Sequence, residues 1–157
     1  MKRKILIPGG AVVVAAVIAV LLLATGGSAK NTSPRVAAGA AVGIKQTALG
    51  KTLVDANGRT LYLFGADTPD RSTLSQAGLA VWPAFTSNGT PKATGGAVSR
   101  LIGTIAGPAG SQQVTYGGHP LYYFSGDTAA GQTNGQGTAG EWYLLGPVAN
   151  VMNGTKQ

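Results

Sequence analysis

Apolar residues are spread unevenly along the chain, and their spacing predicts three kinds of segment. Residues 11–24 form an unbroken apolar run, and residues 26–42 are small and polar with no periodic apolar face. The rest of the chain alternates short apolar runs with Gly-rich turns, a pattern typical of β-strands. The sequence therefore predicts an apolar helix, a flexible tether and then a mainly β domain.

The N-terminal segment has the layout of an export signal. Three basic residues at positions 2–4 precede the apolar run, and the small residues Gly27-Ser28-Ala29 follow it. The run alone is short for a bilayer, but residues 5–10 would extend it enough to span one. We expect residues 1–29 to be a cleaved signal peptide or a single-pass anchor that contacts the membrane through residues 5–27. Either way, the domain lies outside the cytoplasm, membrane-anchored or secreted.

An internal repeat with an offset of 60 residues organises the rest of the chain. Ten of the 29 positions from 54 to 82 are identical at 114 to 142, and Trp82 and Trp142 fall in register. Such self-similarity indicates two copies of one supersecondary unit. We expect one domain over residues 43–150, with repeat one at 43–86, a linker at 87–97 and repeat two at 98–150. A tether at 30–42 precedes this domain and a tail at 151–157 follows it.

Each repeat is predicted to be a β-hairpin unit. Asn57-Gly58 and Gly117-Gly118 each separate two β-prone runs, and these residues accept the positive φ that a tight turn requires. Residues 72–80 are expected to form one or two helical turns, started by a capping box from Thr73 to Gln76. The equivalent residues 128–140 are too rich in glycine for a helix and are expected to be a loop. The fold class is mainly β, with two pseudo-symmetric hairpin repeats packed as one small domain.

Strand alternation predicts which side chains share a face. Tyr62 and Phe64 are expected on one face of their strand, and Leu61 and Leu63 on the other. Together with their repeat partners Leu121 and Tyr123, these leucines are expected to fill one layer of the core.

The repeated motif carries a family resemblance. Tyr-x-Phe-x-x-Asp occurs at residues 62–67, and Tyr-Tyr-Phe-x-x-Asp at 122–127, accompanied by Trp82-Pro83 and by Gly103-Thr-Ile105. Over about residues 42–150 the chain resembles a bacterial family of secreted repeats and predicted lipoproteins with a Tyr-x-(aromatic)-x-x-Asp motif, whose biochemical function is not established. The resemblance implies an exported protein. Members often carry a lipid-anchoring cysteine and two cysteines before the Trp-Pro pair; the latter positions hold Leu74 and Gly78 here.

Composition and charge exclude several classes of functional site and partner. The absence of cysteine excludes a disulfide, a thiolate metal site and cysteine catalysis. The net charge is +7, but three of the positive charges lie at positions 2–4 and the other basic residues are scattered, so no nucleic-acid partner is expected. No serine lies in a Gly-x-Ser-x-Gly elbow, and the Gly-rich segment 131–137 lacks the Lys-Ser/Thr of a phosphate loop. We therefore predict no catalytic residue, no cofactor and no metal site.

Candidate ligand-binding residues are the duplicated motif side chains and the single histidine, namely Tyr62, Asp67, Trp82, His119, Tyr122, Asp127 and Trp142. Their aromatic rings could fill the core or form a paired surface for a glycan, a peptide or a quinone-like ring. The two aspartates could accept backbone N–H groups in Asx-type turns, or act as an acid–base pair or as oxygen ligands of a hard cation. His119 could face solvent in its turn or, with Tyr116 or Tyr122, bind a metal or haem.

These observations favour a non-catalytic extracytoplasmic module of the cell envelope with an unknown ligand or protein partner. The alternative is a cofactor- or metal-binding, redox-associated envelope protein.

Overall fold

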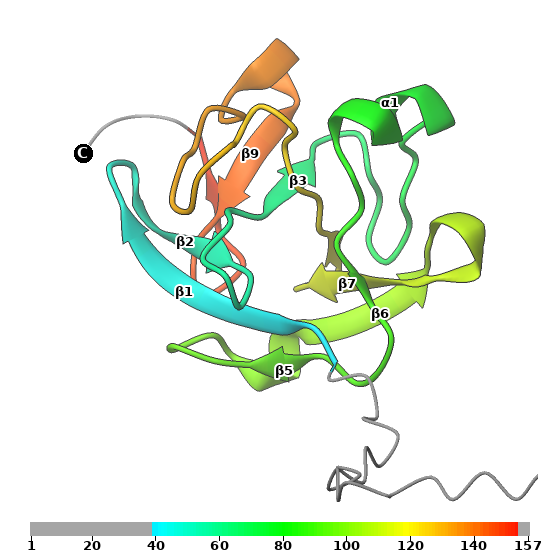
Figure 1. Cartoon of the computed structure of the whole chain (residues 1–157), viewed down its shortest axis with the longest axis horizontal. Helices are drawn as coiled ribbons and strands as arrows, with labels where there is room; N and C mark the ends of the chain where they lie inside the picture. Colours follow the sequence, from blue (N-terminus) through cyan, green and yellow to red (C-terminus); the bar gives the residue numbers. More distant parts are fainter. Residues whose placement is uncertain (1–38, 154–157) are drawn as a thin grey trace, which may run out of the picture. The chain divides into compact units, whose positions relative to one another are not determined.

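Short strands and turns account for most of the computed structural model, which describes residues 39–153 (Figure 1). The elements are β1 (Ala41–Thr47), β2 (Gly50–Val54), β3 (Tyr62–Phe64), α1 (Gln76–Val81), β4 (Thr86–Ser87), β5 (Lys92–Ala93), η1 (Ser99–Leu101), β6 (Ile102–Ala106), η2 (Pro108–Gly110), β7 (Gln112–Tyr116), β8 (His119–Pro120), η3 (Thr138–Gly140), β9 (Trp142–Leu145) and β10 (Val151–Met152). The predicted signal or anchor, residues 1–29, and the tether up to residue 38 lie outside the described residues. Within residues 39–153 no helix is long and apolar enough to cross a membrane.

The strands of this part of the chain pair in three small sheets, ordered β2-β1-β5, β10-β9-β3 and β4-β7-β6, with β8 added to β7. Each repeat opens with an antiparallel hairpin: β1 with β2 in the first, and β6 with β7 in the second. The predicted turns follow these hairpins, and Gly58 has a φ of +78° while Gly117 and Gly118 have φ values of +60° and +81°. The prediction of a mainly β chain built from two repeats is confirmed.

Three segment boundaries differ from the sequence-based expectation. β1 begins at Ala41, inside the expected tether, and buries Val42 completely. The expected linker contains β5, which runs parallel to β1, and the expected tail contains β10, which pairs with β9. These two-residue strands gain order from backbone pairing with a longer neighbour, and such pairing leaves no trace in a hydrophobic pattern.

The predicted helix exists but starts later than expected. Ser75 caps α1, because its hydroxyl accepts the backbone N–H of Gly78 at 3.2 Å. The expected capping box from Thr73 to Gln76 is therefore wrong, and Thr73 instead contacts Asp67. A Cβ atom at Gly78 would lie 2.6 Å from Cδ1 of Leu74, so positions 74 and 78 face each other.

The two repeats exchange strands. β3 of repeat one pairs antiparallel with β9 of repeat two, and Tyr62 lies opposite Leu144 (Figure 1). The equivalent segment of repeat two pairs with repeat one in the same way, because Tyr122 forms an antiparallel β-bridge with Ala84. Tyr62 and Tyr122 also bond each other reciprocally, with N···O distances of 2.8 and 2.9 Å. Because these residues occupy the same place in their repeats, a local two-fold axis passes between them.

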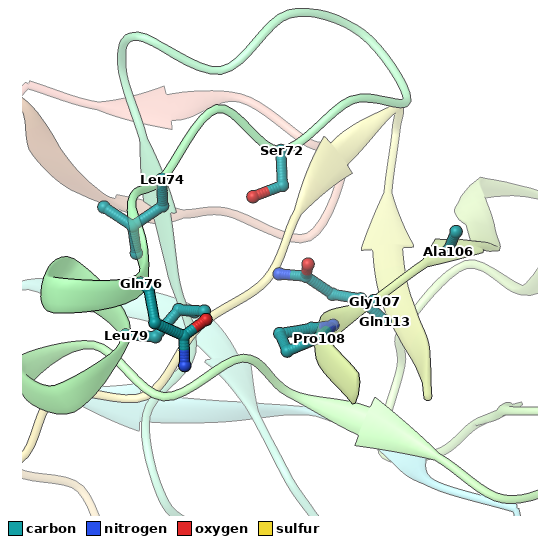
Figure 2. A pocket seen from close by; sticks show the side chains of 8 residues that line it. All are labelled: Ser72, Leu74, Gln76, Leu79, Ala106, Gly107, Pro108 and Gln113. Carbon is teal, nitrogen blue, oxygen red and sulfur yellow. The ribbon is translucent and has the colours of Figure 1, made fainter. Parts of the chain in front are cut away.

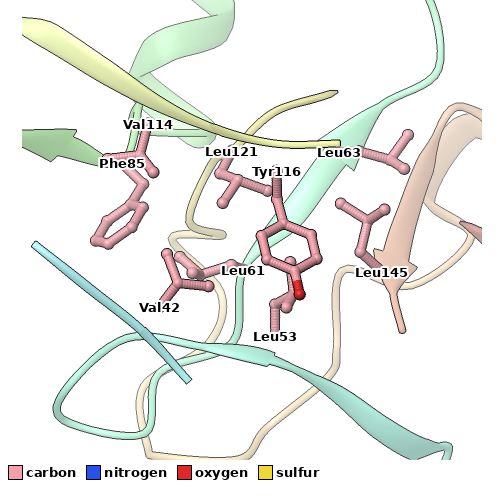
Figure 3. Packing of buried hydrophobic residues seen from close by; sticks show 9 residues of the cluster. All are labelled: Val42, Leu53, Leu61, Leu63, Phe85, Val114, Tyr116, Leu121 and Leu145. Carbon is pink, nitrogen blue, oxygen red and sulfur yellow. The ribbon is translucent and has the colours of Figure 1, made fainter. Parts of the chain in front are cut away.

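Both faces of the exchanged strands are buried, and each face belongs to a different cluster. Leu61, Leu63 and Leu121 lie in the first cluster with Tyr123 packed against it, which confirms the predicted core layer. Figure 3 shows the nine members of that cluster, Val42, Leu53, Leu61, Leu63, Phe85, Val114, Tyr116, Leu121 and Leu145. The opposite face contributes Tyr62 and Tyr122 to a second, aromatic cluster with both tryptophans and Leu144.

Candidate functional site

Six aromatic rings from the two motifs and the two Trp positions meet at the junction of the repeats. We call Phe64, Trp82, Phe124, Trp142, Tyr62 and Tyr122 the junction cluster. Its centre is the indole pair of Trp82 and Trp142, whose ring centroids are 3.7 Å apart with an interplanar angle of 2°. Phe124 stacks on Trp82 at 4.4 Å, and Phe64 stacks on Trp142 at 4.7 Å. Each phenylalanine therefore stacks on the tryptophan of the other repeat.

The two motif tyrosines stand edge-on to the tryptophans of their own repeats. The Tyr62 and Trp82 centroids are 5.5 Å apart at 78°, and the Tyr122 and Trp142 centroids are 5.4 Å apart at 87°. Edge-to-face and offset stacks of this kind add about 0.5–1.5 kcal/mol per pair beyond burial of the ring area. The local two-fold axis thus relates the Tyr62–Trp82 pair to the Tyr122–Trp142 pair.

The tyrosine hydroxyls cross to the aspartates of the other repeat. Tyr62 donates to Oδ2 of Asp127, and Tyr122 donates to Oδ2 of Asp67, both at 2.7 Å. A hydrogen bond to a charged acceptor is stronger than a neutral one. The Tyr-x-Phe-x-x-Asp motif therefore builds half of a reciprocal contact, and two copies are needed to complete it.

The second carboxylate oxygens bind the loops that follow them. Oδ1 of Asp67 accepts the N–H of Thr73 at 2.6 Å, and Oδ1 of Asp127 accepts the N–H of Asn134 at 3.0 Å. The expected backbone N–H bonds are present, but the Asx-type turn is wrong because the donors lie six and seven residues downstream. The two carboxylates thus bind different phenols and different loops.

Burial governs the protonation of the motif tyrosines. Desolvation raises the pKa of Tyr62 and of Tyr122 well above the ordinary value, and the hydrogen bond to an aspartate raises each pKa further. The backbone N–H of Gly135 partly offsets the rise for Tyr62, and the Ser72 hydroxyl partly offsets it for Tyr122. Both phenols are therefore neutral donors at physiological pH.

The Tyr122–Asp67 pair adjoins a cavity. The Tyr122 and Ser72 hydroxyl oxygens are hydrogen-bonded at 2.6 Å, and Ser72 lines a cavity of about 200 Å³ beside α1. Figure 2 shows the polar ends of Ser72, Gln76 and Gln113 around the same space, with Leu74 on one side and Pro108 on the other. Asp67 is half-buried, whereas Asp127 is 8% exposed. The Tyr122 side is thus the more accessible half of the junction.

Sequence reasoning missed a third tyrosine–aspartate pair. Tyr123 donates to Oδ2 of Asp55 at 2.9 Å, and Oδ1 of Asp55 accepts the N–H groups of Asn57 and Arg59 at 2.8 and 2.9 Å. The Arg59 guanidinium lies 4.1 Å from the centre of the Tyr123 ring. An aspartate two residues before Asn-Gly was the signal, because that spacing is typical of an Asx turn. No equivalent exists in repeat two, where threonine follows Val114.

Six of the seven candidate residues meet at the junction, and His119 does not. His119 lies in β8, half-buried, where its backbone pairs with Tyr116. The oxygens considered as its co-ligands are engaged elsewhere: the Tyr116 hydroxyl donates to the carbonyl of Pro147 at 2.6 Å, and the Tyr122 hydroxyl donates to Asp67. Within residues 39–153, no group of three or more His, Cys, Asp or Glu side chains is placed to hold a metal ion.

Strand exchange and crossed Tyr–Asp bonds define a class of protein: a small β domain made from two interdependent repeats. The chain belongs to the family described as a secreted repeat of unknown function, whose model matches residues 43–86 and 103–145. The predicted resemblance is therefore confirmed, and an extracytoplasmic module of unknown role fits this membership. No curated protein and no solved structure matches the chain.

Proposed function

We propose that the chain is a non-catalytic module of the cell envelope, tethered to the membrane by its N-terminal segment or secreted. The observation that supports this is the use of the motif: its Tyr, Phe and Asp side chains all contact the opposite repeat. Side chains held in buried hydrogen bonds and ring stacks are not free to bind a substrate. The motif therefore joins the two repeats, and any ligand binds elsewhere on the domain.

Location can be tested with an epitope tag placed after residue 157 in a bacterial host. Protease added to intact cells should remove the tag from the membrane-bound fraction, or the tag should appear in the medium. A variant without residues 1–29 is the control and should remain inside, protected. Protection of the tag on the full chain in intact cells would contradict the proposal.

We place the ligand-binding face at the cavity beside α1. It combines the neutral polar side chains of Ser72 and Gln76 with apolar walls from Leu74 and Leu79. Ligand sites generally combine apolar walls with a few polar groups that fix orientation. The polar groups that line this cavity are uncharged, which favours a neutral ligand bearing hydroxyl or amide groups, as envelope glycans and peptides do.

A charge placed in the cavity tests this assignment. Gln76 is exposed and lines the cavity, whereas Gln46 is exposed on β1 and does not line it. Gln76→Lys should weaken binding of the protein to isolated cell-wall material, and the matched variant Gln46→Lys should leave it unchanged. Equal effects of the two variants would contradict the assignment of ligand binding to the cavity.

The absorption spectrum and metal content of protein purified from its native host test the non-cofactor part of the proposal. A Soret band or a stoichiometric metal would overturn it in favour of a cofactor-binding, redox-associated envelope protein.

A further inference from the structure

We propose that the junction cluster is a redox-active site that loses one electron to an oxidant. Trp82 and Trp142 give up the electron, and Tyr62 or Tyr122 then replaces it while passing its proton to the aspartate of the other repeat. This activity lies inside the domain and needs no bound ligand. It therefore stands apart from the proposed envelope function.

The indole pair is suited to losing an electron. Indole and phenol are among the most easily oxidised side chains, and the chain has no cysteine thiol to compete with them. The two indoles are parallel within 2° at a centroid distance of 3.7 Å, so both rings can share a positive charge. Trp82 is 5% and Trp142 is 4% exposed, so only a small part of either residue contacts solvent.

Each tyrosine next to the indole pair has a base for its proton. A phenol releases an electron readily only when its proton leaves too, because the oxidised phenol is a very strong acid. Oδ2 of Asp127 lies 2.7 Å from the Tyr62 hydroxyl oxygen, and Oδ2 of Asp67 lies 2.7 Å from that of Tyr122. Both phenols are fully buried, so these carboxylates stand in place of water as proton acceptors.

The reaction balances in two steps. The oxidant, an inorganic or peroxyl radical, takes one electron from the indole pair and becomes an anion, which leaves an indole radical cation. Tyr62 then donates one electron to Trp82 over the edge-to-face contact, and its proton moves to Asp127. The products are neutral tryptophan, a neutral tyrosyl radical and a protonated carboxyl group. The pseudo-symmetric path runs from Tyr122 to Trp142, with Asp67 as the proton acceptor.

Packing alone does not require this arrangement. Phenylalanine at both tyrosine positions would fill nearly the same volume, and an uncharged residue in place of Asp127, which is 8% exposed, would avoid the free-energy cost of burying a carboxylate. The third pair, Tyr123 with Asp55, provides an internal comparison. It has the same hydrogen bond, but the Tyr123 ring packs edge-on against Phe85 in the first cluster, away from the indole stack.

Pulse radiolysis of the full chain with the azide radical tests the proposal. The absorption of the tryptophan radical should decay as that of the tyrosyl radical grows. Replacing both acceptors, Asp67→Asn with Asp127→Asn, should slow this transfer roughly a hundredfold, the range that a positioned base contributes to proton transfer. Asp55→Asn is the matched control and should leave the rate unchanged.

A second measurement covers the case in which the double variant fails to fold by circular dichroism. In heavy water the transfer in the unaltered protein should slow, because the tyrosine proton moves with the electron. The proposal is overturned by an unchanged rate in heavy water, by an unchanged rate in a folded double variant, or by the absence of any tyrosyl radical. An equal slowing in Asp55→Asn would also overturn it.

Discussion

Asp127→Asn is the sharpest test of the crossed contacts, because it keeps the shape of the side chain and changes its hydrogen-bonding capacity. Both carboxylate oxygens of Asp127 act as acceptors, one for the Tyr62 hydroxyl at 2.7 Å and the other for the N–H of Asn134 at 3.0 Å. An asparagine offers one acceptor and one donor. Whichever way the amide turns, its NH₂ group faces a donor.

The magnitude follows from the burial of the contact. A buried donor left without an acceptor costs about 1–3 kcal/mol, and the Tyr62 side chain is fully buried. We expect Asp127→Asn to lower the free energy of unfolding by about 2 kcal/mol, which corresponds to about 8 °C in Tm for a domain of this size. Asp67→Asn should cost less, because Asp67 is half-buried and water can solvate the amide group of the new asparagine.

Thermal and denaturant unfolding of the variants, alone and combined with Tyr62→Phe, provides the assay. In the double-mutant cycle, the Tyr62→Phe, Asp127→Asn variant should lose less stability than the sum of the two single variants. Additivity within about 0.3–0.5 kcal/mol would refute an energetic role for the cross-repeat bond. A larger loss from Asp67→Asn than from Asp127→Asn would refute the argument from burial.

Two further variants and a pH titration probe the same junction. Gly135→Ala places a Cβ atom 2.7 Å from Cη2 of Trp82, and the overpacking should cost about 1–3 kcal/mol and change the near-ultraviolet circular dichroism; an unchanged spectrum would contradict the close contact. Trp82→Ala should lower the free energy of unfolding by about 3–5 kcal/mol in denaturant titrations, and a loss below 1 kcal/mol would contradict the stacking. Burial raises the pKa of Tyr62, Tyr122 and Tyr123 above the unfolded value, so their contribution to stability is complete below about pH 10 and declines as the pH rises further. Tyrosinate absorbance should therefore show these three phenols ionising only as the fold is lost, and their ionisation near pH 10 in folded protein would contradict this.

The sequence predicted the parts of the junction and did not predict how they join. The register of Trp82 with Trp142 and the repeated motif marked the residues, because a duplication leaves identities at a fixed offset. The partner of each tyrosine could not be deduced, since Tyr62 precedes its own Asp67 by only five residues. Strand exchange directs Tyr62 to Asp127 instead, and exchange depends on tertiary packing rather than on local preference.

Prediction from the glycine content of the sequence has a similar limit. The sequence predicts a loop over residues 128–140, and the structure has turns there with a single 3₁₀ turn at Thr138–Gly140. The close approach of Gly135 to Trp82 and Tyr62 explains why a side chain is not accommodated there. That constraint arises from a ring 53 residues earlier in the chain, so no local pattern reveals it.

Strand exchange also has a consequence for the order in which the chain can fold as it is synthesised. Repeat one emerges first, yet β3 lacks its partner until residues 142–144 follow, and Tyr62 lacks its acceptor until Asp127 does. Contacts this distant in sequence form slowly, because the intervening loop must close first. The first half therefore cannot complete its sheet and its tyrosine contacts alone, and the fold is reached only when both halves are present.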